Sequence, residues 1–107
     1  MPHFMFQASY SGDALSALGK NPEDRTATVR RLIESVGGRL ESFYMCFGEY
    51  DAICIYEAPD NAAAAALAIA AGAAGSIATS KTTPLLTGEE GREAMARSAS
   101  AAYTPPG

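Results

Sequence analysis

The sequence holds few residues that exchange protons readily near neutral pH. His3 is the only histidine among the 107 residues, and imidazole is the side chain best suited to that exchange. If the protein is an enzyme, we expect His3 together with Asp51 to be its catalytic residues. His3 also lies close to the first residue, where chains fray, so the alternative is an exposed histidine with no role in a site.

Tyr44, Tyr56 and Lys81 form a second set of candidates, because each falls on a predicted strand and ends in a hydrogen-bonding group. If the three share one sheet face, they can line a ligand pocket. A lysine among tyrosines binds an anion, or acts as a base where burial disfavours its charged form. The alternative for Lys81 is an edge-strand position facing solvent, where lysine prevents sheets from aggregating.

The stretch FGEYDAICIYEAPD, residues 47–60, places two further candidates at a corner between strands. Tyr50 and Asp51 can hydrogen-bond a ligand where two subunits meet. Asp51 can instead serve only the turn, by accepting hydrogen bonds from nearby backbone N–H groups. The sequence therefore leaves the corner open between a binding site and a turn.

Cys46 and Cys54 are the only cysteines, and together with His3 they cannot supply the four ligands of a zinc site within one chain. No glycine motif for phosphate binding follows a predicted strand. We therefore expect no metal and no cofactor. The first residues, MPHFMFQ, lack the basic and apolar regions of an export signal, so we expect a cytoplasmic protein with both thiols reduced and buried.

The apolar pattern and the breaker residues predict the elements that must hold these side chains. Alternation predicts strands, and an apolar stripe at i, i+3, i+4 and i+7 from Val29 predicts a helix with one packed face. Asn21-Pro22 is expected to start that helix, Gly37-Gly38 to end it, and Asp60 to cap a later alanine-rich helix. The predicted strands cover 3–10, 39–47, 51–57 and 75–83, and the predicted helices cover 13–18, 22–36, 61–72 and 88–98.

The order β-α-β-β-α-β is that of a ferredoxin-like α+β fold, with an antiparallel sheet and both helices on one face. We expect residues 1–88 to form this domain and residues 89–107 to form a short C-terminal helix and a flexible tail. The other sheet face has no cover within the chain, and alanine adds little area to the core. We therefore expect a homodimer or a larger assembly, with a second copy on that face.

Two registers are possible for the hairpin around the GEYD corner. In the first, Glu49-Tyr50 is a two-residue loop, and both faces mix large apolar with polar side chains. In the second, an extra residue near Gly48 places Phe43, Met45, Phe47, Ile53 and Ile55 on one face and Ser42, Tyr44, Cys46, Cys54 and Tyr56 on the other. The second separates the side chains better, so we expect it. It leaves the Tyr-rich face open to a partner or ligand and sets Cys46 beside Cys54.

The residues around this corner resemble a known family. They resemble the GYD-domain family of small bacterial proteins at Phe43-Tyr44, at residues 47–51, and at residues 57–60 before an alanine-rich helix. Glu49 is inserted in the Gly-Tyr-Asp signature. The resemblance covers residues 3–88 and implies a fold of the dimeric α+β barrel type. Residues 48–60 are also similar to the hairpin of effector-binding domains in Lrp/AsnC-type regulators. That similarity implies assembly through sheets, with small molecules bound between subunits.

Charge and composition narrow the classes of partner. The formal net charge is -4, and Arg30-Arg31 is the longest basic run, so we expect no nucleic-acid partner. Residues 61–80 are uncharged but consist mostly of alanine and glycine, so we expect no membrane partner. Two functions remain: a homo-oligomeric domain that binds a small molecule, and a cofactor-free small enzyme of the isomerase or monooxygenase kind. The scarcity of His and Cys favours the first.

Overall fold

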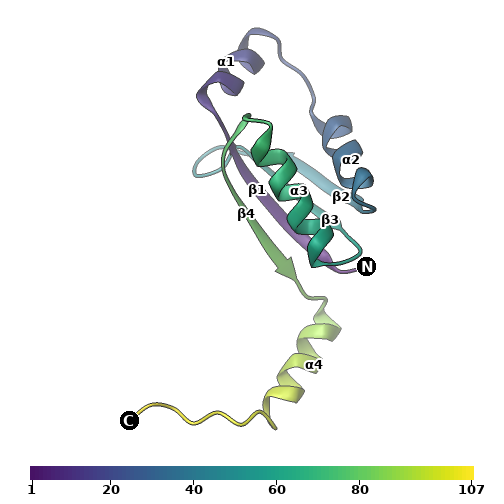
Figure 1. Cartoon of the computed structure of the whole chain (residues 1–107), viewed down its shortest axis with the longest axis vertical. Helices are drawn as coiled ribbons and strands as arrows, with labels where there is room; N and C mark the ends of the chain where they lie inside the picture. The colour runs from purple at the N-terminus through teal and green to yellow at the C-terminus, as the bar shows by residue number, and fades with distance from the viewer.

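Strands and helices follow one another in the predicted order, and the computed structural model describes all residues, Met1–Gly107. The elements are β1 (His3–Tyr10), α1 (Gly12–Lys20), α2 (Thr26–Ser35), β2 (Arg39–Met45), β3 (Ala52–Glu57), α3 (Asn61–Ala73), β4 (Ile77–Leu85) and α4 (Gly88–Ser98). The four strands form one antiparallel sheet in the order β2-β3-β1-β4. Helices α2 and α3 lie on one face of it (Figure 1). The predicted ferredoxin-like α+β fold is therefore confirmed.

Helix starts follow local capping chemistry. The Asp60 side chain accepts a hydrogen bond from the Ala63 N–H, so the predicted cap of α3 is confirmed. The expected start of α2 at Asn21-Pro22 is wrong, because α2 begins at Thr26. The backbone N–H of Asn21 bonds back to Ala17 and ends α1, while the Asp24 carboxylate accepts from both the N–H and the hydroxyl of Thr26.

The end of α2 needs its two glycines for different reasons. Gly37 has a φ of 84°, in the left-handed region that glycine adopts without strain. At Gly38 a Cβ atom would lie 2.3 Å from the backbone oxygen of Glu57, so only glycine fits there. This close approach brings the chain from α2 directly against the end of β3 as β2 begins.

The two faces of the sheet differ from the expected ones. Phe43 pairs with Cys54 and Tyr44 pairs with Ile53, which is the alternation of the register we did not favour. The irregularity lies between Leu40 and Ser42, where Glu41 is the extra residue, and not near Gly48. The expected face assignment is therefore wrong: Cys54 and Tyr56 lie under the helices, and Ile53 and Ile55 lie on the open face.

The cysteines are also placed differently from the expectation. Cys54 is buried, but Cys46 is exposed, so only one of the two thiols belongs to the core. Cys46 stands opposite Asp51, whose backbone oxygen accepts its N–H at 2.8 Å, and both thiols are free. The expected neighbouring pair of Cys46 and Cys54 does not form, because the observed register sets Cys54 opposite Phe43.

The core lies between the sheet and the two helices that cover it. Phe4 and Tyr56 stack there with ring centroids 5.5 Å apart, and both are almost completely buried. Each such side chain contributes about 1.5–3 kcal/mol to stability by leaving water. Strands and helices both supply the core, which consists of Phe4, Phe6, Ala8, Ile33, Cys54, Tyr56, Ala58, Ala64 and Leu67.

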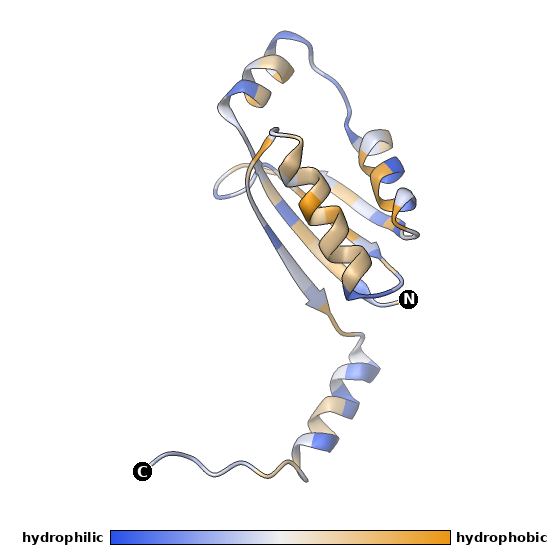
Figure 2. Cartoon of the chain, in the orientation of Figure 1, coloured by the Kyte–Doolittle hydropathy of each residue, from blue (hydrophilic) through white to orange (hydrophobic).

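The C-terminal part extends beyond the sheet. β4 contains Pro84, which the sheet accommodates because β4 is an edge strand. Helix α4 lies past the end of β4 and away from the rest of the chain (Figure 1). Charged and apolar residues alternate along it, whereas α3 is apolar over most of its length (Figure 2). None of the helices combines the length and the apolarity that crossing a bilayer would require.

Candidate functional site

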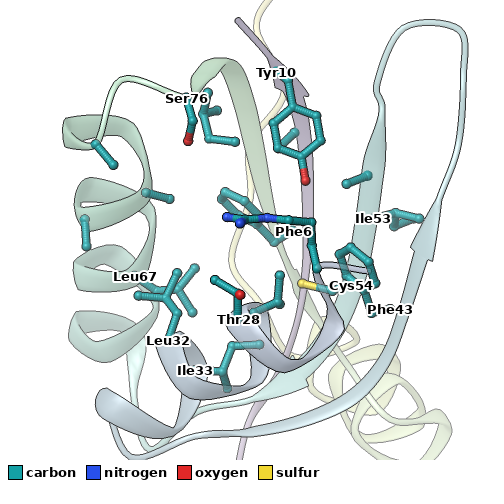
Figure 3. A pocket seen from close by; sticks show the side chains of 18 residues that line it. Phe6, Tyr10, Thr28, Leu32, Ile33, Phe43, Ile53, Cys54, Leu67 and Ser76 are labelled. Carbon is teal, nitrogen blue, oxygen red and sulfur yellow. The ribbon is translucent and has the colours of Figure 1, made fainter. Parts of the chain in front are cut away.

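A cavity of about 280 Å³ lies between the covered face of the sheet and helices α2 and α3. Eighteen residues line it, and fifteen of them are hydrophobic. Strands supply the floor with Phe6 and Phe43, α2 supplies Leu32, and α3 supplies Leu67 (Figure 3). Ligand sites in proteins are concave, mostly apolar and built on preformed elements, which this cavity is.

Three hydroxyl groups point into this cavity. They belong to Tyr10 at the end of β1, Thr28 on α2 and Ser76 before β4 (Figure 3). A few hydroxyls in an apolar wall can orient a bound molecule through hydrogen bonds, while the apolar wall supplies most of the binding energy. The arrangement is thus suited to a compact molecule with one polar end.

Arg25, the residue before α2, is the only charged residue that lines the cavity. Its guanidinium forms an ion pair with Glu23 and lies next to the Tyr10 hydroxyl; the hydrogen bond to Glu23 is the main reason that its pKa is raised. Arg25 and Phe43 also line a shallow hollow between residues 22–26 and the end of β2. The cavity therefore adjoins the surface at Arg25.

Burial decides the protonation of the two ionisable groups on the covered side of β3. It raises the pKa of Cys54, which lines the cavity, to about 11 and that of Tyr56 to about 12. Both groups stay protonated at neutral pH, so the Cys54 thiol is a weak nucleophile there. The Tyr56 hydroxyl is buried and has no hydrogen-bond partner in the protein.

Asp51, the last residue of the GEYD corner, joins two strands. Its carboxylate accepts a hydrogen bond of 2.9 Å from the Tyr10 N–H, and its own N–H donates to the Ala8 oxygen at 2.9 Å. The alternative in which Asp51 serves only its own turn therefore does not match this hydrogen bond, which reaches Tyr10 on another strand. The carboxylate instead extends the pairing of β3 with β1 and holds the backbone of Tyr10, whose ring lines the cavity.

The predicted catalytic pair is not assembled. His3 pairs with Glu57 at one end of β1, whereas Asp51 binds Tyr10 at the other end, about 23 Å along the strand. The expectation that His3 and Asp51 share one site is therefore wrong.

Two of the three predicted pocket residues on strands do share the open face. Tyr44, Ile53, Gln7 and Lys81 stand in one row across the four strands. Tyr44 and Lys81 occupy opposite edges, roughly 14 Å apart. Tyr56 was expected beside them, but it lies on the covered face. Tyr50 is half-buried in the corner loop, and its backbone oxygen accepts from the Cys46 thiol at 3.3 Å.

A polar cluster that the sequence did not predict surrounds His3 on the open face. Its Nδ1 lies 2.8 Å from Glu41, and its Nε2 lies 4.0 Å from Glu57. Glu57 is also paired with Arg39, whose hydrogen bonds are the main reason that the pKa of Glu57 is lowered. The bulge at Glu41 directs this side chain toward β1, and no local sequence signal marks that bulge.

Tyr10 and Arg25 are the site residues that the sequence reasoning missed. Asp24 followed by Thr26 is the signal that could have found Arg25, because an acid that bonds two residues ahead marks a helix start at Thr26. That start sets Arg25 beside the first turn of α2. Tyr10 had no comparable signal, since its position depends on a contact with Asp51, 41 residues away in sequence.

Comparisons with known proteins agree with this architecture. The family model of the GYD domain matches residues 4–95. In fold, the chain is similar to the crystal structure of MtbAldR, an Lrp/AsnC-like protein, with a TM-score of 0.54 and 15% identity. The likeness covers 80% of this chain and 52% of that one, so this chain spans about half its length. At this identity it shows the fold alone. No curated protein matches the chain in sequence.

Proposed function

This chain belongs to the GYD-domain family, and we propose that it is a self-associating domain that binds a small, largely apolar molecule between its sheet and its helices. The observation that carries the proposal is the cavity of about 280 Å³ with its apolar wall and three inward hydroxyls. Packed strands and helices hold the lining side chains, so binding requires little reorganisation of the backbone.

The open face of the sheet supports the proposal of self-association. Met5 and Ile55 form its apolar centre, and Tyr44 and Lys81 stand at its edges. Ile53 stands next to this centre near the start of β3, where it also borders the cavity. An apolar centre within a polar rim is the composition of a protein interface. Strands that are apolar on both faces occur mainly in sheets covered on both sides. A second copy of this chain presents the same surface and can cover it symmetrically.

Tyr44, Tyr50 and Lys81 belong to this second part of the proposal. The rings of Tyr44 and Tyr50 and the amine of Lys81 lie on or beside the open face. There they can contact a second copy or a molecule held between two copies. Tyr56 is excluded from that role by its place under the helices.

The cavity is tested with 2-naphthamide, a neutral, flat aromatic probe, followed by amide chemical shifts of the labelled protein. We expect saturable shifts that localise to α2, α3 and the residues near Tyr10. Ala71→Leu adds three carbon atoms inside the cavity and should abolish these shifts, whereas Ala66→Leu on the exposed side of α3 should leave them unchanged. Equal binding to the two variants would reject the cavity as the binding site.

Self-association is tested by light scattering over a range of concentrations. We expect the native chain to show at least twice the monomer mass at micromolar concentration. Ile55→Lys places a charge in the apolar centre of the open face and should reduce the mass to that of the monomer. Ile69→Lys is the matched control, because Ile69 is 71% exposed on α3 and its change should leave the mass unaltered. Monomer mass for the native chain at high concentration would refute the proposal.

A further inference from the structure

We propose that the cavity selects a singly charged anion: a compact, flat apolar body that carries one carboxylate, or a group of like charge, held by Arg25 and Tyr10. This inference rests on the proposed function and names the chemical class of its ligand. Arg25 is the only charged residue in the lining, and no acidic residue lines the cavity. Glu23 pairs with this guanidinium from outside the lining, so a neutral ligand would place no opposite charge against it inside the cavity, whereas a carboxylate matches it in charge and in shape.

The Arg25 guanidinium retains N–H donors that can bind a carboxylate. Its hydrogen bond to Glu23 uses Nη1, so the edge formed by Nε and Nη2 can present two parallel N–H groups. The Tyr10 hydroxyl lies beside the same guanidinium and points into the cavity (Figure 3). A carboxylate at this place can therefore accept from the guanidinium and from the hydroxyl together. Asp51 supports the site by fixing the backbone of Tyr10.

The mouth of the cavity limits the charge of the ligand. Glu23 and Asp24 line the shallow hollow that adjoins the cavity at Arg25. Their carboxylates repel anions, and a dianion such as a phosphate monoester is repelled about twice as strongly as a carboxylate. One guanidinium that is already paired with Glu23 cannot balance two further negative charges. The arrangement therefore favours a single negative charge at the mouth.

The walls of the cavity fit a flat body. On the α3 side, Ala70, Ala71 and Ala74 line it, and their small side chains leave that wall level. On the strand side, the rings of Phe6 and Phe43 contribute aromatic surface (Figure 3). A planar ring system between an alanine wall and aromatic rings makes extensive contact and allows offset or edge-on packing. Branched or bulky bodies would lose that contact.

The test compares two probes that share one ring system, 2-naphthoate and neutral 2-naphthamide, titrated into the full chain and followed by amide shifts. We expect the native chain to bind naphthoate at least tenfold more tightly than naphthamide. Arg25→Gln should weaken naphthoate binding at least tenfold and change naphthamide binding less than twofold. Arg30→Gln, an exposed charge on α2 outside the lining, should change neither. A lower affinity of Arg25→Gln for both probes would contradict selection of the charge.

A second variant acts in the opposite direction and does not depend on Arg25 itself. Glu23→Gln removes the carboxylate that competes for the guanidinium, so naphthoate should bind severalfold more tightly while naphthamide binding is unchanged. If neither probe binds the native chain, the proposed function itself fails. If both probes bind the native chain equally, or if Glu23→Gln does not strengthen naphthoate binding, only the inference of an anionic ligand is overturned.

Discussion

The two faces of the sheet are built from the same strands but are used differently. On the covered face, Phe4 and Tyr56 are at most 2% exposed and stack beneath the helices. On the open face, their neighbours Met5 and Ile55 are equally apolar but only half-buried within the chain. Apolar character alone therefore does not tell which face carries the helices. Apolar side chains on both faces are typical of sheets that are covered on both sides, which is why we propose that a second copy covers the open face.

The comparison of the two faces predicts that substitution by alanine has very different effects on stability at two neighbouring residues of β1. Phe4→Ala empties a site in the core and should cost about 3–5 kcal/mol of unfolding free energy. Met5→Ala, one residue along on the open face, should cost much less when measured on dilute monomer, but it should weaken self-association. Urea unfolding at low concentration, combined with light scattering at high concentration, measures both effects. Equal losses of unfolding free energy would mean that the two faces are equally packed within one chain.

The dependence of stability on alkaline pH should differ between the buried thiol of Cys54 and the exposed thiol of Cys46. The folded state keeps Cys54 protonated up to a pKa of about 11, whereas the unfolded chain loses that proton near pH 9. The stability that this group contributes is therefore fully present below pH 9 and lost as the pH rises to 11, by roughly 2–3 kcal/mol. Cys54→Ala should flatten this slope of stability against pH, and Cys46→Ala should keep it. An unchanged slope in Cys54→Ala would assign the alkaline loss to other groups, with Tyr56 the first to examine.

Much of the fold could be predicted because the signals for its elements are local. The alternation at the start of the chain predicted β1 to the residue, and Asp60 predicted the start of α3. The start of α2 was misplaced because Asn21-Pro22 is a common helix signal, yet the N–H of Asn21 is already used to end α1. Local propensity was outweighed there by the neighbouring helix.

The candidate site could be predicted only in part, because it depends on contacts between distant residues. The bulge at Glu41 decides which side chains of β2 face the helices, and nothing near it in sequence marks it. Tyr56 was assigned to the open face because the expected hairpin register groups it with Tyr44 and Cys54. Here the stacking on Phe4 accompanies burial of an unpartnered hydroxyl. The cavity itself joins segments from Phe6 to Ile77, so no single stretch of sequence predicts it.

Substitution of Asp51 tests how much its carboxylate stabilises the pairing of β1 with β3 at the Tyr10 end of β1. Asp51→Ala removes the acceptor of the Tyr10 N–H and should cost about 1.5–3 kcal/mol, in the range for a hydrogen bond to a charged group. Asp51→Asn keeps an acceptor oxygen and should recover most of that loss. Urea unfolding of the three proteins gives the comparison. The alanine variant should also bind 2-naphthamide less tightly, because Tyr10 lines the cavity. Native stability in Asp51→Ala would show that the carboxylate is dispensable for pairing β1 with β3.

Tyr50 gives the smallest expected effect on stability and the sharpest test of the open face. The corner uses its backbone, since the Cys46 thiol donates to the Tyr50 oxygen and Gly48 adopts a φ of 124°. These features do not require an aromatic ring at residue 50. We therefore expect Tyr50→Ala to change the unfolding free energy by less than about 0.5 kcal/mol, and to weaken self-association severalfold through lost stacking on a second copy.

Glu49→Ala is the matched control for Tyr50→Ala, because Glu49 is an exposed residue of the same loop and its change should affect neither quantity. Sedimentation of the three proteins at several concentrations gives their association constants, and dilute urea unfolding gives their stability. If Tyr50→Ala unfolds readily while associating as the native chain does, its half-buried ring belongs to the fold of one chain. The corner would then serve only the hairpin, and the interface would consist of the strand residues alone.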